Sequence, residues 1–159
     1  MRLMESYTYV LNMPLRIKKG QRPKYRLIHA TNHRDGCLLM VDNIRKRWDL
    51  LQDIQTGGQM QLFTETPENE IIDDDDIRQK TIEHFSQCKN WTSLHDALAI
   101  FFIKHGPICA TGDVKKILLQ LQKEGSLGIM RNPDATTYGT PTKFMSENNK
   151  QTVSVRWQK

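Results

Sequence analysis

Residues 114–130, "VKKILLQLQKEGSLGIM", decide the predicted fold of the C-terminal half of this 159-residue chain. Apolar residues three and four positions apart predict an amphipathic helix over 112–124, capped by Thr111. The apolar face of this helix comprises Val114, Ile117, Leu118 and Leu121. Gly125 ends the helix, because glycine readily adopts the left-handed conformation that turns the chain back into an apolar strand at 126–131.

The segments around this unit complete a recognisable order. Two further helices are predicted before it, at about 75–88 and 93–105, with Thr92 or Ser93 capping the second. A strand over 152–157 follows a polar loop and ends the chain. Three helices followed by two strands with a polar loop between them are typical of a winged helix-turn-helix.

The N-terminal half shows a different periodicity. Alternate apolar residues from Tyr7 to Ile17 predict a strand with one buried face, and "KYRLIHAT" at 24–31 returns as its partner in a β-hairpin. A long helix follows, with Asn32 able to cap its first turn. Its apolar face comprises Cys37, Met40, Val41, Ile44, Trp48 and Leu51. Because an isolated hairpin is marginally stable, residues 1–54 are expected either to dock on the C-terminal half or to pair with a second copy in a homodimer.

Charge divides the chain into three segments. Residues 1–59 contain 11 Lys and Arg against 5 Asp and Glu, residues 60–76 contain 7 acidic residues and no basic ones, and residues 77–159 contain 12 basic against 6 acidic. The sequence therefore predicts an α+β protein with a hairpin-and-helix unit at 1–59, an acidic linker at 60–76 and a winged helix over 77–159.

Several functional classes find no support in the sequence. No apolar run approaches a membrane span, the start is not a secretion signal, and the three widely spaced cysteines indicate a reducing, cytoplasmic compartment. No phosphate-binding glycine loop, metal-ligand cluster or nucleophile with an adjacent base is present. His29 and His33 lack a carboxylate partner at a useful spacing, and Asp73–Asp76 favours helix capping over metal binding. We therefore expect no catalytic residues, no metal and no cofactor.

Net positive charge in the C-terminal segment favours duplex nucleic acid as the partner, bound with low sequence specificity through phosphates. The start of the third helix would enter the groove, and lysines on its outer side would meet phosphates. The candidate residues are Thr111, Lys115, Lys116, Lys123, Arg131, Lys143 and Lys150. One alternative is that these lysines only solvate an amphipathic helix, and another is that the winged helix is a protein-contact or dimerisation module.

The stretch "YRLIHATNHRDGCLLMVDNI" at 25–44 resembles the C-terminal part of the three-Cys-motif partner proteins, a bacterial family. The pattern "Y-x-L-I-x-A-T-N-H" followed by "G-x-x-x-M" carries the likeness, which covers roughly residues 7–54. The matching residues are Tyr25, Leu27, Ile28, Ala30, Thr31, Asn32, His33, Gly36 and Met40.

This resemblance implies a methyltransferase-like Rossmann domain followed by a winged helix-turn-helix. The part expected to bind S-adenosylmethionine would lie upstream of residue 1, so the chain resembles either a fragment of such an enzyme or a short relative that retains the tail. On this interpretation "TNHRDG" at 31–36 joins the last sheet strands to a covering helix and is not an active site.

Overall fold

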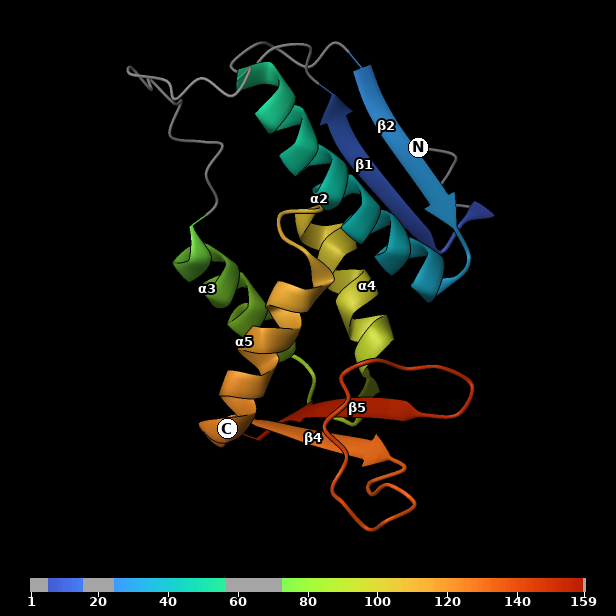
Figure 1. Ribbon diagram of the computed structural model, residues 1–159, viewed down its shortest axis with the longest axis vertical. Helices are drawn as coiled ribbons and strands as arrows, with labels where there is room; N and C mark the ends of the chain where they lie inside the picture. The colour runs from blue at the N-terminus through green and yellow to red at the C-terminus, as the bar shows by residue number, and fades with distance from the viewer. Residues whose placement is uncertain (1–5, 16–24, 57–72, 159) are drawn as a thin grey trace.

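The computed structural model describes residues 6–15, 25–56 and 73–158, and for 14, 15, 25 and 48–56 it describes the backbone alone. Ile17 and most of the acidic segment 60–76 lie outside the described residues. Within them the fold is α+β, with four helices and two small antiparallel sheets (Figure 1). The helices are α2 (Arg34–Thr56), α3 (Asp74–Phe85), α4 (Leu94–His105) and α5 (Thr111–Lys123). The strands are β1 (Tyr9–Leu15), β2 (Tyr25–Thr31), β3 (Thr92–Ser93), β4 (Leu127–Asn132) and β5 (Thr152–Trp157).

The N-terminal hairpin forms where alternation predicted it. β1 and β2 pair antiparallel, from Tyr9 opposite Thr31 to Leu15 opposite Tyr25. Leu11 is only 2% exposed, as the apolar stripe predicted, but its neighbour Val10 is also buried. Successive residues of a strand point to opposite faces, so burial here is not confined to one face as the sequence suggested.

α2 buries the first part of the face that its periodicity predicted. Cys37, Val41 and Ile44 are buried, whereas the side chains of Trp48 and Leu51 lie outside the described part. The prediction that Asn32 caps this helix is wrong, because its side-chain oxygen accepts a hydrogen bond from the Thr8 backbone N–H at 2.9 Å. The Asn32 carboxamide therefore ties the end of β2 to the start of β1 instead of closing the first turn.

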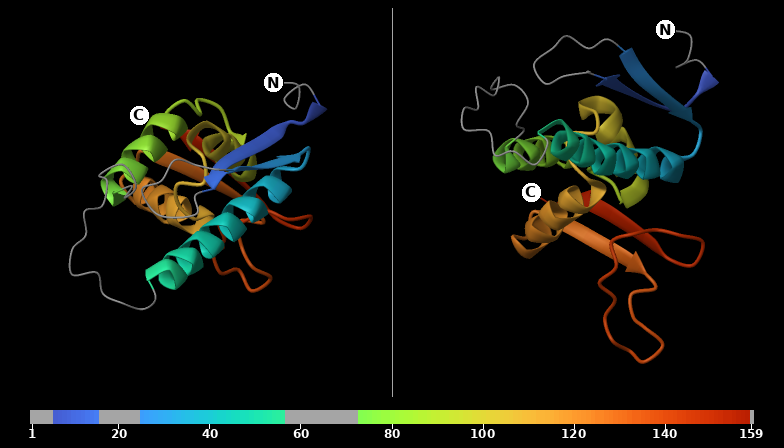
Figure 2. Two further views of the ribbon diagram at one scale, coloured as in Figure 1. Left: turned by 90° about the horizontal axis from the view of Figure 1, so that it is seen from above. Right: turned by 45° about the horizontal axis from the view of Figure 1, so that its top comes forward.

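The hairpin and α2 dock on the C-terminal half, which is one of the two outcomes expected for them. α2 lies between the hairpin and α5 (Figure 2). Leu11 of β1 and Val41 of α2 belong to the same buried cluster as Phe102 of α4 and Leu118 of α5. One continuous core therefore supports both parts of the chain, and burial of this apolar surface is the main stabilising contribution.

The C-terminal helices form close to their predicted positions. α3 begins at Asp74, inside the segment assigned to the linker, and ends at Phe85, three residues before the predicted end. Ser93 caps α4 by accepting a hydrogen bond from the Asp96 N–H at 3.3 Å. The short strand β3 was not predicted; it pairs with β5, giving a three-stranded sheet in the order β3-β5-β4.

Gly125 makes the turn between α5 and β4. Its φ of 72° lies in the left-handed region, as predicted. The Ser126 N–H donates to the Leu121 carbonyl at 3.0 Å, and the Gly125 N–H donates to the Gln122 carbonyl at 3.1 Å. These two bonds satisfy carbonyls at the end of the helix and direct β4 back along the core.

Replacing Gly125 should destabilise the fold, whereas replacing a helical glycine should not. A Cβ at either Gly125 or Gly112 meets no heavy atom within 4 Å, so only the backbone conformation differs between the two sites. We expect Gly125→Ala to lower the free energy of unfolding by about 1 kcal/mol. Gly112→Ala, within α5, should leave it unchanged or raise it by up to about 1 kcal/mol. Urea denaturation of both variants tests this, and equal effects would contradict the assigned turn.

Candidate functional site

The residues that the sequence nominated for binding lie on α5, on β4 and on the long β4–β5 loop. α5 packs its inner face, formed by Val114, Leu118 and Leu121, into the core beside α3 and the three-stranded sheet (Figure 1). Lys116 lies on the outer side, with its side chain 77% exposed, and Lys123 is exposed in the last turn.

Thr111 is not placed as the sequence suggested. It is the first residue of α5 and not its cap, a position that Ala110 occupies. Its side chain is buried, with the residue 7% exposed, and both its backbone N–H and its hydroxyl donate to the Asp42 carboxylate of α2, each at 2.8 Å. The carboxylate comes from another helix, so no local sequence signal could have revealed this contact.

Lys115 also turns toward the interior of the molecule. The residue is half-buried, and burial lowers the pKa of its ammonium group, while the carboxylates of Asp42 and Glu147 act in the opposite direction. A half-buried lysine whose charge already interacts with two carboxylates of its own chain is less available to an external phosphate. Lys115 and Lys116 are adjacent in sequence but differ in exposure, because Lys115 is half-buried and Lys116 is exposed.

Arg131 holds the β4–β5 loop against the sheet. Its Nε–H donates to the Phe144 carbonyl at 2.9 Å, a second guanidinium nitrogen lies 3.4 Å from the Met145 sulfur, and burial lowers the pKa of the group. Lys143 and Lys150, by contrast, are exposed. The nominated set therefore divides into two residues with internal hydrogen bonds, Thr111 and Arg131, the half-buried Lys115, and four exposed lysines.

Sequence reasoning missed a buried polar cluster at the start of α4. Glu147 is its centre, with a side chain 3% exposed. Its carboxylate accepts the Leu94 N–H at 2.8 Å and the Ser93 hydroxyl at 3.0 Å, and it pairs with the Arg34 guanidinium at 3.1 Å. We call Arg34, Asp35, Ser93, His95, Asp96 and Glu147 the Glu147 cluster.

His95 uses both ring nitrogens within this cluster. Its Nε2 accepts the Glu147 backbone N–H at 3.0 Å, so the ring proton resides on Nδ1, which donates to Asp35 at 2.7 Å. No ring nitrogen is left to exchange a proton with a substrate. Arg34 and Asp35 belong to "TNHRDG", which leads from β2 into α2, and their side chains also connect the start of α2 to α4.

A second ion pair in the cluster connects the hairpin unit to α4. Arg34 donates to Asp96 at 2.8 Å, and the Tyr9 hydroxyl of β1 donates to the same carboxylate at 3.4 Å. Burial, followed by the charge of Asp96, raises the pKa of Tyr9. The residue types of this cluster gave no sequence signal, because Glu147 lies in a polar loop without periodicity.

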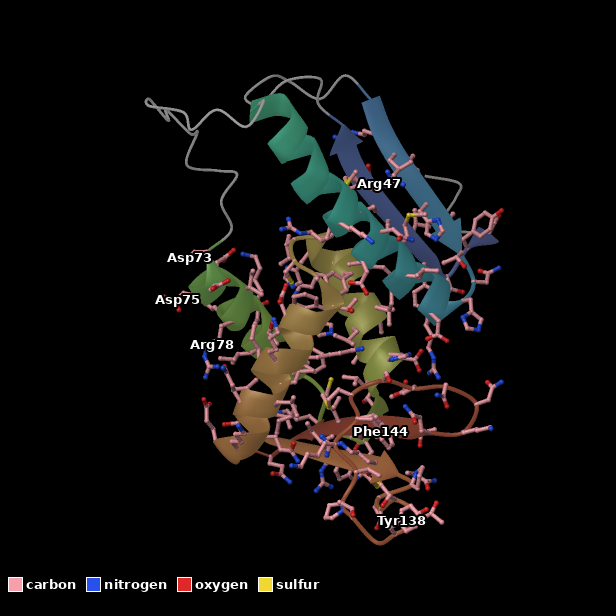
Figure 3. All side chains as sticks on the ribbon, in the orientation of Figure 1. Arg47, Asp73, Asp75, Arg78, Tyr138 and Phe144 are labelled. Carbon is pink, nitrogen blue, oxygen red and sulfur yellow. The ribbon has the colours of Figure 1, made fainter. Side chains whose placement is uncertain are left out.

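The β4–β5 loop also carries an exposed aromatic residue. Tyr138 lies at the tip of the β4–β5 loop, 95% exposed, and Figure 3 shows it at the end of the loop most distant from the hairpin.

Across the described ranges, no three His, Cys, Asp or Glu side chains lie together so that they could hold a metal ion. In the same ranges, no helix is long and apolar enough to cross a membrane.

Comparisons with known proteins give no family. No family model matches this chain, and neither a curated protein nor a solved structure matches it.

Neutralising Glu147 should destabilise the molecule far more than neutralising a surface carboxylate. Glu147→Gln removes the buried charge that Arg34 and the start of α4 compensate, and we expect a loss of about 2 kcal/mol in the free energy of unfolding. The matched control is Glu124→Gln, whose carboxylate pairs with Arg78 at 2.8 Å at the surface and should lose about 0.5 kcal/mol or less. Urea denaturation at pH 7 measures both, and a Glu147→Gln loss no greater than the control would contradict the role assigned to the cluster.

Proposed function

We propose that the segment from α3 to β5 is a winged helix-turn-helix that binds duplex nucleic acid, mainly through phosphate contacts and without catalysing a reaction. The order α3, β3, α4, α5, β4, β5 and the sheet order β3-β5-β4 support this proposal, because they place a helix pair and a strand ribbon around one core. α5 would be the recognition helix, and the β4–β5 loop would be the wing.

The observation that carries the proposal is the set of exposed lysines on these two elements. Lys123, Lys143 and Lys150 form no ion pair with any described residue, and Lys116 contacts only Asp113 of its own helix at 3.1 Å. Exposed cations without a carboxylate partner are suited to phosphate, because binding does not require an existing ion pair to break. Tyr138 adds an aromatic side chain at the tip of the wing.

In this proposal the nominated residues have two roles. Lys116, Lys123, Lys143 and Lys150 contact phosphates, whereas Thr111 holds α5 and Arg131 holds the wing in position. Lys115 is half-buried and has neither role. Contacts of this kind fix orientation and carry little sequence information, so we expect low sequence specificity.

The resemblance of residues 25–40 to the three-Cys-motif partner proteins supports the same assignment, because in that family a winged helix-turn-helix follows the Rossmann domain. We propose that this chain corresponds to the C-terminal part of such a protein. S-adenosylmethionine binding would then belong to the preceding domain and not to the residues described here.

Duplex binding should weaken steeply with salt, and each contacting lysine should contribute to the slope. We expect Lys123→Gln and Lys143→Gln each to reduce the slope of log K against log salt by about 0.9, with similar effects on unrelated DNA sequences. Lys104→Gln is the control, because it removes the same charge from the end of α4, where Lys104 pairs with Glu83. Fluorescence anisotropy at several salt concentrations measures all three slopes.

Absence of wild-type binding at low salt would overturn the proposal and favour the protein-contact reading of α5. An equal effect of Lys104→Gln would show that net charge alone, and not this surface, determines binding. A change in binding for only one DNA sequence would contradict phosphate-based recognition.

The hairpin supports a second candidate function, a contact with another copy of this chain. Leu27 and Ile28 of β2 are 39% and 41% exposed, although both are large apolar residues, and Tyr7, which lies just before β1, is 40% exposed. Apolar strand residues left exposed at a sheet of this size favour pairing with another strand. We expect light scattering to show a dimer that Ile28→Lys converts to a monomer, and a wild-type monomer at all concentrations would exclude it.

A further inference from the structure

We propose that Asp42 of α2 restrains duplex binding, because its carboxylate occupies the start of α5 and attracts Lys115. This inference rests on the proposed function and describes the regulation of the same surface. The contact is internal to the chain and joins the N-terminal unit to the proposed recognition helix.

The geometry at the start of α5 resembles the binding of an anion. Both oxygens of the Asp42 carboxylate are used: one accepts the Thr111 backbone N–H and the other accepts the Thr111 hydroxyl, each at 2.8 Å. The N-terminus of a helix carries a partial positive charge, and a phosphate from a ligand would meet the same donors. Asp42 therefore takes the place that a phosphate contact at this end would need.

The charge of Asp42 has a second effect. Asp42 and Glu147 are the carboxylates whose attraction opposes the effect of burial on the pKa of Lys115. Asp113, in the first turn of α5, adds a further negative charge and contacts Lys116. A phosphate approaching this end of the helix thus meets carboxylates, while the lysine beside them already faces its own chain.

The contact is partly buried, with its charged partner at the surface. Asp42 is an exposed residue, whereas its partner Thr111 is buried. Removing its charge therefore changes the potential at the binding surface without emptying a space in the core. This property makes the contact a restraint on affinity that can be removed while the fold persists.

Asp42→Asn tests the charge separately from the contact. The asparagine carbonyl oxygen can accept the Thr111 N–H, and its amide can donate to the Thr111 hydroxyl, so both hydrogen bonds have a neutral counterpart. We expect the duplex dissociation constant to fall roughly three- to tenfold at low salt. The control is Asp75→Asn at the start of α3, shown in Figure 3, which removes the same charge from a carboxylate that makes no hydrogen bond to α5 and should change affinity less than about twofold.

Two more variants keep the test decisive should Asp42→Asn fold poorly. Asp42→Ala removes charge and contact together and should also bind more tightly, whereas Asp42→Glu keeps the charge and should bind as the wild type does. Circular dichroism melting identifies the temperature range in which all variants are folded, and anisotropy titrations are made within it.

The possible outcomes separate this inference from the proposed function. Tighter binding by both neutral variants, with Asp75→Asn and Asp42→Glu unchanged, supports the restraint. If the wild type binds the duplex, but neutral substitutions at Asp42 improve binding no more than Asp75→Asn does, the inference is overturned and the proposed function remains intact. Absence of duplex binding by the wild type and by every Asp42 variant would overturn both.

Discussion

A buried carboxylate at the start of α4 sets the arrangement of the molecule. Removing a charge from water costs several kcal/mol unless hydrogen bonds and an opposite charge compensate it. Glu147 obtains that compensation from Leu94 and Ser93 at the start of α4 and from Arg34 at the start of α2. All of these groups must be in place together, so the β4–β5 loop, the helix start and the N-terminal unit adopt their positions as one system.

This arrangement also determines which part of α5 remains open. With α2 held across the molecule, Asp42 reaches the first residue of α5, and Lys115 faces carboxylates of the chain. Lys116 and Lys123 of α5 and the lysines of the β4–β5 loop stay exposed. α2 therefore contributes both to the buried core and to the charges around the start of α5. The proposed binding surface lies away from that start, toward Lys123 and the β4–β5 loop.

The features that sequence patterns predicted correctly are those that depend on residues close together in the chain. The period of α5 and the left-handed turn at Gly125 could be read from residues 114–130, because helix amphipathicity and glycine conformation are properties of short segments. The two-residue strand β3 is too short to have a period, and Thr111 was mistaken for a cap because its partner Asp42 lies on a different helix. Glu147 was missed for the same reason, since its partners lie more than fifty residues away in sequence.

Native-state hydrogen exchange tests most directly whether the N-terminal unit and the C-terminal helices form one cooperative body. The account predicts that the amides of Val41 in α2 and Leu98 in α4, both fully buried in the same cluster, open with the same free energy and the same dependence on denaturant. Exchange of Val41 through a separate opening of much lower free energy, while Leu98 stays protected, would contradict it and show that α2 is only loosely attached.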